Sequence, residues 1–268
     1  MVGLLGSLCF AVAAAEPLPT PSSFAWAFAA GTAGIAGLGA FYYALSRGTM
    51  GVVAPLTGVI GAGLPVVIGV ISGEQLEPVR AVGVVLALTA VVLISLPGTP
   101  RTTDERRLLR IDLGELPLVV VAGVGFGLFF VFINESARAG GTWWPLAVVR
   151  LAGVIFIVAG ILVAIVHTRA ARSTTRAEIV LGLPKVRARA LPLPLLGGLL
   201  LMTGLGDLGG NVFFLLATRA GELSVAVVLS SLYPVVTTLL AAVFLRERLR
   251  PVQVAGVLLA ALSVPLLR

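Results

Sequence analysis

The sequence has one cysteine, one histidine and few charged residues. Charged side chains make up 12% of the 268 residues, whereas soluble globular proteins carry about 25%. The single cysteine, Cys9, excludes a disulfide within the chain and a cysteine-cluster metal site. With one histidine, His167, the sequence also lacks the usual metal clusters and nucleophile–base pairs, and it has no GxxxxGK(S/T) phosphate-binding stretch. We therefore predict a protein that is not an enzyme and that uses no metal and no cofactor.

Apolar residues, glycine and proline are abundant instead. Hydrophobic residues make up 58% of the chain, which also has 32 glycines and 16 prolines, and the mean hydropathy is +1.08. Glycine and proline are both commoner in membrane helices than in soluble ones. The net charge is +7, but the basic residues lie in short loops between apolar runs, where they set membrane orientation. The composition predicts an integral protein of a lipid bilayer that binds no nucleic acid.

Apolar runs of about 20 residues, the length that crosses a bilayer, recur along the chain. Their charged and turn-forming boundaries define the predicted spans. These spans are 24–45, 49–72, 79–97, 116–134, 143–166, 191–218, 222–245 and 251–267. Residues 1–15 are apolar but short, and they resemble the apolar region of a signal peptide without its basic start. We predict an all-α polytopic membrane protein of the cytoplasmic membrane.

An internal repeat relates positions that are 173 residues apart. The stretch GEQLEPVRAVGVVLA (73–87) aligns without gaps on RERLRPVQVAGVLLA (246–260), and the same alignment continues upstream. The matching pairs are Gly31–Gly204, Gly37–Gly210, Phe41–Phe214, Ala44–Ala217, Gly48–Gly221, Glu74–Glu247, Leu76–Leu249, Pro78–Pro251, Val79–Val252 and Gly83–Gly256. Apolar sequences match easily by chance, but prolines, glycines and a glutamate that share one alignment indicate a true repeat.

The repeat predicts two transporter halves. Residues 1–97 form a truncated first half with three full spans, 98–115 form a basic linker, and 116–268 form a second half with five spans. Because five spans are an odd number, two tandem copies must lie in the membrane with opposite orientations. This is the inverted-repeat plan of many secondary transporters, whose binding site lies between the halves near the midplane.

The same residues resemble a known family. SLYPVVTTLLAAVFLRERLRPVQVAGVLLA (231–260) is similar to the end of an EamA-type half in the drug/metabolite transporter superfamily, and ALSRGTMGVVAPLTG (44–58) with SGEQL (72–76) is similar to the first half. The resemblance implies ten helices in two five-helix halves and a small-molecule transporter that does not hydrolyse ATP. The family's first helix has no counterpart here, which we interpret as a truncated gene product or a wrongly chosen start. A second copy or another partner would then complete the bundle, so a homodimer is left open.

Lysine and arginine are distributed unequally between alternate loops. One side has fourteen: Arg47, four arginines of 101–110, six basic residues of 169–189, and Arg246, Arg248 and Arg250. The other side has four: Arg80, Arg138, Arg219 and Arg268. The positive-inside rule places the first set in the cytoplasm and the C-terminus outside. The family resemblance implies that both termini are inside, so the two expectations differ.

Two ionisable residues fall inside the predicted spans. Asp207 is central in 191–218, and Arg150 lies about two turns into 143–166. An ionisable side chain costs about 2.5–3.5 kcal/mol at a helix centre on insertion scales, so it usually faces a bundle interior or a cavity. Arg150 lies about 10 Å and Asp207 about 18 Å from the same membrane side, a difference that a long arginine side chain can largely cover. Glu135 is the rival partner for Arg150.

Small and polar residues surround Asp207 on its own helix. Thr203, Gly204, Gly210 and Asn211 are three or four positions away and share its face. Glycines there allow another helix to approach closely or leave space for a ligand. One interpretation is that Asp207 and Asn211 line the path of a small-molecule substrate and bind a cationic group or a proton, with Arg150 as the counter-charge. The other is a structural Asp207–Arg150 pair or an interhelical hydrogen bond.

Prolines inside two spans form a second candidate site. Pro234 cannot donate a hydrogen bond to the carbonyl of Ser230, and Ser231 and Tyr233 lie beside this gap. Broken helices near the midplane expose carbonyls and helix ends to a substrate. In the first copy, Pro234 aligns with Gly61, and the prolines of that helix are Pro55 and Pro65. The alternative is a packing kink stabilised by serine hydroxyls.

Other polar and aromatic residues favour structural roles. Trp143 and Trp144 begin a span and are typical of an interfacial belt. Glu74 and Glu247 end equivalent helices, which favours a role in a helix turn over a gate contact. Taken together, we predict a secondary transporter or exporter of small metabolites or drug-like compounds that works by alternating access. The alternative is a non-transporting membrane scaffold or a degenerate partner subunit.

Overall fold

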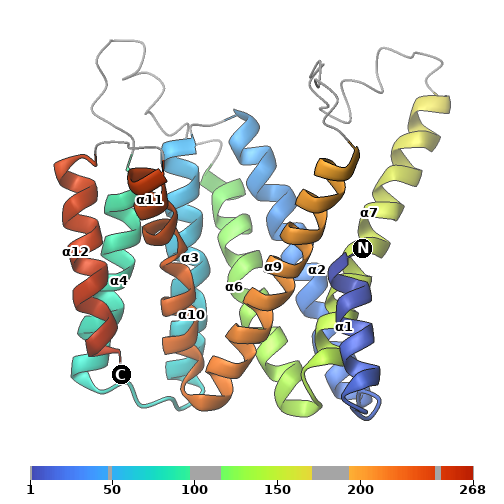
Figure 1. The fold of residues 1–268 in the computed structure, drawn as a ribbon, viewed down its shortest axis with the longest axis horizontal. Coiled ribbons are helices and arrows are strands. Elements are labelled where there is room, and N and C mark those ends of the chain that lie inside the picture. Colours follow the sequence, from blue (N-terminus) through green and yellow to red (C-terminus); the bar gives the residue numbers. More distant parts are fainter. Residues whose placement is uncertain (1, 48–49, 97–115, 171–192, 245–248, 268) are drawn as a thin grey trace. The chain divides into compact units, whose positions relative to one another are not determined.

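The structure is a computed structural model that describes residues 2–47, 50–96, 116–170, 193–244 and 249–267. Within these ranges every regular element is an α-helix (Figure 1). The helices are α1 (Val2–Ala13), α2 (Pro21–Arg47), α3 (Met50–Ile71), α4 (Pro78–Ser95), α6 (Leu116–Ala139), α7 (Trp143–Ala170), α9 (Leu193–Ala220), α10 (Leu223–Ser231), α11 (Tyr233–Phe244) and α12 (Pro251–Leu266). The predicted all-α polytopic fold is confirmed.

Each predicted span corresponds to a helix or a helix pair. Among the described residues, seven stretches are long and apolar enough to cross a membrane. One of them, Leu223–Phe244, consists of α10 and α11 in succession. The eighth predicted span corresponds to α12, an apolar helix of 16 residues. The short apolar segment at 1–15 forms α1, with 12 residues. The predicted linker 98–115 lies almost entirely outside the described residues.

The chain forms two compact units that differ from the predicted sequence halves. The first unit contains Met1–Thr32 and Ser136–Val212, and the second contains Ala33–Glu135 and Phe213–Arg268. Each unit therefore combines segments from both copies of the repeat. The division into two transporter halves describes the sequence repeat and stays a prediction.

In the first unit, a loop carboxylate fixes the start of α7. The Glu16 carboxylate accepts hydrogen bonds from the backbone N–H groups of Thr142 (2.7 Å) and Trp143 (3.0 Å). These N–H groups have no partner inside the helix, so an anion placed there stabilises the helix start. The two tryptophans predicted as an interfacial belt also make specific contacts: Trp144 donates to the Glu16 carbonyl at 3.1 Å, and the Trp143 ring stacks on Phe10 at 4.7 Å.

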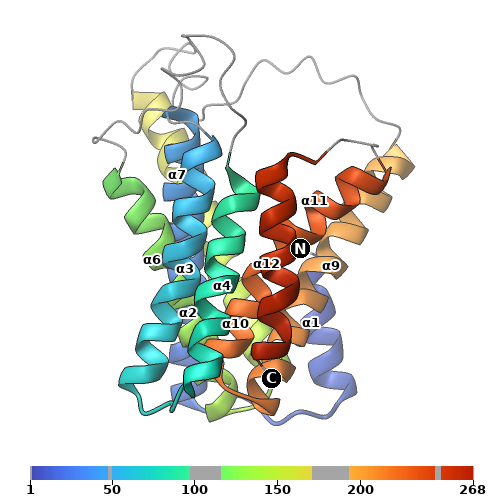
Figure 2. The same cartoon turned by 90° about the vertical axis from the view of Figure 1, so that its left-hand side faces the viewer.

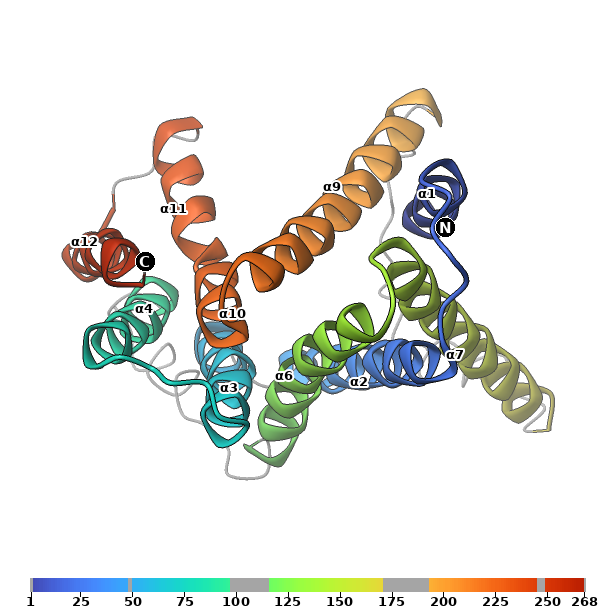
Figure 3. The ribbon, with the colours of Figure 1, turned by 90° about the horizontal axis from the view of Figure 1, so that it is seen from below.

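In the second unit, glycines bring α2, α3 and α6 together. A Cβ on Gly125 would lie 2.7 Å from the Cα of Gly37, and one on Gly123 would lie 2.5 Å from the Ile60 side chain. Such close backbone approach between helices needs small residues. Seen from below, α3 lies between α4 and α6, with α10 beside it (Figure 3). α3, α4, α6 and α10 are therefore neighbours within this unit.

The packing of α4 against α12 follows the sequence repeat. These helices are equivalent in the two copies and lie side by side (Figure 2). A Cβ on Gly83 of α4 would lie 3.0 Å from the side chain of Leu267, and a Cβ on Gly256 of α12 would lie 2.6 Å from that of Ile94. The repeat offset relates Gly83 to Gly256 and Ile94 to Leu267, so the two contacts are equivalent. Reciprocal contacts between antiparallel, equivalent helices are compatible with an inverted repeat.

The described basic residues of the second unit lie at its two opposite ends. Because α4 and α12 are antiparallel, Arg250 at the start of α12 lies at the end of the unit opposite Arg80 at the start of α4. Arg47 ends α2 just before α3 begins, on the same side as Arg250. Arg80 pairs with Glu222, at the start of α10, at 3.1 Å. The predicted grouping of Arg47 with Arg250, and of Arg80 with Arg219, agrees with this packing.

Candidate functional site

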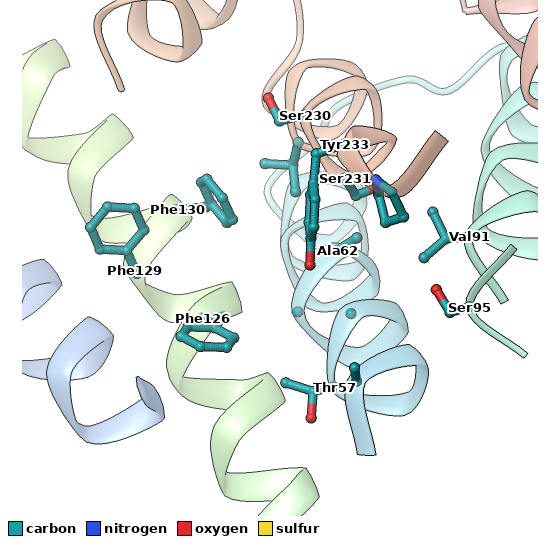
Figure 4. Close-up of a pocket in the computed structure, with 15 residues that line it drawn as sticks. Thr57, Ala62, Val91, Ser95, Phe126, Phe129, Phe130, Ser230, Ser231 and Tyr233 are labelled. Carbon is teal, nitrogen blue, oxygen red and sulfur yellow. The ribbon is translucent and has the colours of Figure 1, made fainter. Parts of the chain in front are cut away.

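The second unit contains a cavity of about 310 Å³ (Figure 4). Its walls come from α3, α4 and α6, and from the junction of α10 and α11. The lining residues are Ala54, Thr57, Gly58, Gly61, Ala62, Val91, Ser95, Phe126, Phe129, Phe130, Val227, Ser230, Ser231, Tyr233 and Pro234. None of these residues is charged, so the cavity suits a solute that brings an apolar body and few polar groups.

Aromatic rings form one wall of this cavity. Phe126, Phe129 and Phe130 lie on one face of α6, because residues three and four positions apart share a face of a helix. In Figure 4 the Tyr233 ring stands between these phenylalanines and the side chains of Val91 and Ser95. Tyr233 is 66% exposed. Its ring is therefore available to a solute instead of being packed into the core.

The helix break beside the cavity is the one predicted at Pro234. α10 ends at Ser231 and α11 begins at Tyr233, with Leu232 between them. The N–H of Leu232 donates to the Leu229 carbonyl at 3.2 Å, which tightens the last turn of α10. Proline has no N–H to offer the Ser230 carbonyl. The break therefore places both Ser230 and Pro234 in the cavity wall.

The hydroxyl groups at this break are used within their own helix. Ser230 Oγ donates to the Ala226 carbonyl at 2.8 Å, and Ser231 Oγ donates to the Val228 carbonyl at 2.6 Å. Serine hydroxyls that bond backward in this way often bend a helix. The sequence analysis gave a packing kink with bonded serine hydroxyls as the alternative to a substrate site. These bonds fit that alternative, and they lie beside the cavity.

Prolines have a different effect in α3. Pro55 and Pro65 are both buried, and α3 is continuous from Met50 to Ile71. Pro55 does not line the cavity, although its neighbour Ala54 does. Pro55 therefore neither breaks α3 nor lines the cavity, and the candidate site in the second unit consists of Ser230, Tyr233 and Pro234 with their neighbours.

Thr57 is a cavity residue that the sequence did not single out. Its side chain is 2% exposed, and its Oγ1 atom has no hydrogen-bond partner in the structure. A buried hydroxyl without a partner costs about 1–3 kcal/mol, so most such groups have one. Thr57 is a polar residue in an otherwise apolar helix, and the phenylalanines of α6 recur at spacings of three and one. Both features are visible in the sequence, but neither is unusual in a membrane helix, so they do not by themselves indicate a cavity.

In the first unit, Arg150 and Asp207 form an ion pair. Arg150 Nη2 lies 2.8 Å from Asp207 Oδ2. Arg150 comes from α7 and Asp207 from α9. The comparison of their depths had indicated that the arginine side chain could reach Asp207. Of the two carboxylates proposed for Arg150, Asp207 is the one that forms the pair. The Arg150 side chain is 12% exposed and that of Asp207 is 62% exposed.

A cavity of about 580 Å³ adjoins this ion pair. Its lining residues come from α1, α7 and α9: Val2, Gly3, Leu4, Arg150, Gly153, Val154, Ile157, Leu200, Thr203, Gly204 and Asp207. Gly204 allows the close approach that the sequence predicted, because a Cβ there would lie 2.6 Å from the Val2 side chain. At Gly210 a Cβ would meet no atom within 4 Å, so Gly210 has no such role in the structure.

Asn211 supports Asp207 and does not line this cavity. Its Nδ2 donates to the Asp207 carbonyl at 2.8 Å and lies 3.3 Å from Asp207 Oδ1. An amide that donates to a carboxylate restrains its orientation. Asn211 thus acts on the cavity through Asp207.

Glu74 also has a defined structural role. Its carboxylate accepts a hydrogen bond from the N–H of Leu223 at 3.0 Å and others from the N–H and the hydroxyl of Ser224. Glu74 therefore caps the start of α10, a helix distant in sequence, in the same way that Glu16 caps α7. Its equivalent Glu247 lies outside the described residues, as does the side chain of His167.

The predicted site residues thus divide between the two units. Arg150, Asp207 and Asn211 belong to the first unit, whereas Ser230, Tyr233 and Pro234 belong to the second. In the part of the chain that the structure describes, no group of three or more histidine, cysteine, aspartate or glutamate residues is arranged to hold a metal ion. What each cavity can bind is therefore set by the shape and polarity of its own walls.

The fold and the cavities define a multi-pass helical membrane protein, and comparisons with known proteins place it more narrowly. One solved structure, described as "Crystal structure of protein", has a TM-score of 0.66 and 16% sequence identity, and the match covers 99% of this chain and 84% of that one. At this identity the likeness concerns the fold. No curated protein matches the sequence. Residues 113–268 match the EamA-like transporter family, and the chain belongs to that family.

Proposed function

We propose that this protein is a secondary transporter that exports small metabolites or drug-like compounds across the cytoplasmic membrane by alternating access. The cavity in the second unit is the observation that carries this proposal. The broken helix α10–α11 forms one part of its wall, and uncharged aromatic side chains form another. Transporters of this general plan bind their substrates at interrupted helices inside the bilayer.

The walls of this cavity favour a solute with a flat apolar body. Three phenylalanines and Tyr233 offer ring faces for stacking, which contributes about 0.5–1.5 kcal/mol for each aromatic pair beyond the burial of area. Thr57, whose buried Oγ1 has no hydrogen-bond partner in the protein, also lies in this wall. A cavity of about 310 Å³ lies at the small end of the usual size range for ligand sites. We therefore expect small aromatic metabolites and drug-like compounds with one hydrogen-bonding group.

The reciprocal packing of α4 and α12 supports alternating access. Equivalent helices that exchange equivalent contacts can be related by a pseudo-two-fold axis, as in inverted-repeat transporters. Such a transporter changes its open side by rocking one half against the other. Asp207, Arg150 and Asn211 are proposed as a second, polar binding position, with Asp207 contacting a substrate group or a proton.

Flux measurements on the purified protein test this proposal. Reconstituted vesicles should show saturable uptake of at least some members of a panel of small aromatic metabolites and drugs, and the uptake should need no ATP. Y233A should lower that flux severalfold, because it removes an exposed ring from the cavity wall. Y42A is the matched control, because Tyr42 is 62% exposed and does not line the cavity.

Two results would contradict the proposal. If no solute of the panel is transported above protein-free vesicles, the alternative of a non-transporting scaffold or partner subunit gains support. If Y233A and Y42A lower flux equally, transport does not use this cavity.

A further inference from the structure

Two polar contacts bind α3 and α4 to the start of α10 in the second unit. The Glu74 carboxylate, in the turn between α3 and α4, accepts hydrogen bonds from the N–H of Leu223 at 3.0 Å and from the N–H of Ser224 at 3.3 Å. It also accepts from the hydroxyl of Ser224. Arg80, in the first turn of α4, pairs with Glu222 at 3.1 Å. We call Glu74, Arg80, Glu222 and Ser224 the clasp.

Two glycines make room for the clasp. A Cβ on Gly69, near the end of α3, would lie 2.5 Å from the Ser224 hydroxyl oxygen and would overlap the Glu74 carboxylate. Gly73 has a φ of +100°, a conformation that side chains rarely adopt, so the turn that carries Glu74 needs a glycine there. The carboxylate thus lies in a space between α3 and α10 that is open only because residue 69 has no side chain.

The clasp joins the two equivalent walls of the cavity. The end of α3 and the start of α10 meet at the clasp, so these neighbouring helices run in opposite directions (Figure 3). Several lining residues are pairs from the two copies of the repeat, 173 positions apart. These pairs are Ala54–Val227, Thr57–Ser230, Gly58–Ser231 and Gly61–Pro234. The cavity therefore lies between α3 and its repeat equivalent, and the clasp closes the space between them at one end.

The contacts of the clasp are of a kind that can open. The N-cap residue of α10, Glu222, makes no side-chain cap hydrogen bond, so the N–H groups at this helix start depend on Glu74. Hydrogen bonds of this type exchange with bonds to water at a small net change in free energy. The contacts of α4 with α12 differ, because they are apolar and close at Gly83 and Gly256.

Opening of the clasp would also reach the cavity wall. α10 has nine residues and is about 14 Å long, and the helix break at Ser231 follows directly. A short helix that is bound at one end and broken at the other can move as one piece. Release of its start therefore changes the position of the wall at Val227 and Ser230.

We propose that the clasp is a gate for the cavity of the second unit at the end that carries Arg80. The gate is closed while Glu74 holds the start of α10, and the cavity opens toward this end when Glu74 releases it. This inference rests on the proposed function only for the passage of a solute, because opening can be measured without transport.

The rate at which a cavity cysteine reacts tests the opening. In a C9S background, A62C places a thiol in the cavity wall, and A87C places one in the packed core between α4 and α12. A charged methanethiosulfonate reagent is applied to right-side-out and to inverted vesicles, so that each membrane side is tested separately. E74Q keeps the shape of the side chain but has one acceptor oxygen in place of two.

E74Q should raise the reaction rate of A62C severalfold, and only from the side on which R80C is labelled. The reaction rate of A87C should not change. E77Q is the matched control, because Glu77 is exposed in the same turn and makes no side-chain cap hydrogen bond. An unchanged rate at A62C would overturn the proposal. Equal increases at A62C and A87C would overturn it as well, because they would indicate general loosening of the fold.

A reversible cross-link tests the same gate in the closed form. E74C and S224C, introduced together into C9S, are joined with a short bis-methanethiosulfonate reagent, and mass spectrometry confirms that the link has formed. Flux of any solute that the reduced protein transports should stop in the linked protein and return after reduction. C9S treated in the same way should transport normally. Undiminished flux through linked protein would contradict the gate.

The two measurements separate this inference from the proposed function. Faster reaction of A62C in E74Q, in a protein that transports no solute, would support the gate while the proposed function fails. Transport by a protein in which E74Q leaves the reaction of A62C unchanged would do the reverse.

Discussion

At the scale of single residues, Thr57 shows how a site can cost stability. Its buried hydroxyl has no partner, although Thr89 on α4 bonds to the Val85 carbonyl at 2.7 Å in the usual way. An unsatisfied buried hydroxyl lowers stability by about 1–3 kcal/mol. A side chain of this kind at a cavity wall is explained if a solute supplies the missing partner.

T57V should therefore separate stability from binding. It keeps the shape of the side chain and removes the unsatisfied group, so the thermal midpoint should stay the same or rise. Binding of an aromatic solute with a hydrogen-bond acceptor should weaken by about 2- to 10-fold, the value of one neutral hydrogen bond. T89V is the control, and it should leave solute binding unchanged. If T57V binds the solute as well as the wild type, the hydroxyl does not contact it.

Gly31 illustrates a residue whose role is steric. A Cβ there would lie 2.5 Å from the backbone oxygen of Val149 and 2.7 Å from the Cβ of Ala152. G31A should lower the free energy of unfolding by about 1–3 kcal/mol, because backbone on one side cannot move aside easily. Gly39 lies on the same helix with no atom within 4 Å of its Cβ position. G39A should be neutral or stabilising by up to about 1 kcal/mol, and equal thermal midpoints for the two variants would contradict this steric role.

Sequence reasoning found the charged residues of the sites more readily than the aromatic ones. Arg150 and Asp207 stand out because ionisable residues are rare inside apolar runs. Their depths allowed them to pair, but Glu135 remained the rival partner for Arg150. Phenylalanine and threonine are ordinary in membrane helices, so Phe126 and Thr57 gave no comparable contrast. The choice between cavity wall and lipid face depends on neighbouring helices, which a single sequence does not specify.

At the scale of helices, the start of α10 depends on a residue far away in the chain. Its N-cap residue, Glu222, makes no side-chain cap hydrogen bond, whereas Glu74 accepts from the N–H groups of Leu223 and Ser224. Glu74 follows α3, so this contact joins the end of α3 to the start of the broken helix. The sequence indicated a helix-turn role for Glu74 but gave no sign of which helix it caps.

E74A should accordingly lower stability by about 1–2 kcal/mol, since it leaves N–H groups at a helix start without a partner. E77A is the matched control: Glu77 is exposed and is the N-cap residue of α4, with no side-chain cap hydrogen bond. The thermal midpoint of E77A should equal that of the wild type. A decrease of the same size in both variants would mean that loss of charge at this end matters, and not the cap.

Prolines show why element boundaries were only partly predictable. Pro234 coincides with a break after α10, whereas α3 passes through Pro55 and Pro65 without one. A proline removes one hydrogen bond in either case. Whether the helix then separates depends on the packing around it, and Pro55 and Pro65 are buried among neighbouring helices. The composition of the span alone could not distinguish the two outcomes.

At the scale of the whole molecule, the internal repeat was the most informative feature of the sequence. An alignment at one offset anticipated that Gly83 and Gly256 are equivalent, and the structure gives each the same contact with a residue of the other helix. The apolar runs also located nearly every helix, because length and apolarity are strong requirements of a bilayer. The compact units could not be anticipated, since each combines segments from both copies.

Membrane sidedness follows from the same large-scale pattern. Fourteen basic residues are predicted on one side and four on the other, and in the second unit Arg47 and Arg250 lie at the end opposite Arg80. Cytoplasmic loops carry an excess of lysine and arginine. We therefore expect the end with Arg47 to face the cytoplasm and the end with Arg80 to face outward.

The single cysteine makes this expectation easy to test. C9S gives a cysteine-free background, into which R47C, R250C, R80C and R219C are introduced one at a time. In intact cells a membrane-impermeant maleimide should label R80C and R219C, whereas R47C and R250C should react only after the membrane is opened. The reverse pattern would mean that the charge bias does not set the orientation of this chain and would favour the sidedness that the family resemblance implies. Labelling of R47C and R80C from the same side would contradict the helix packing itself, because α3 separates these two ends.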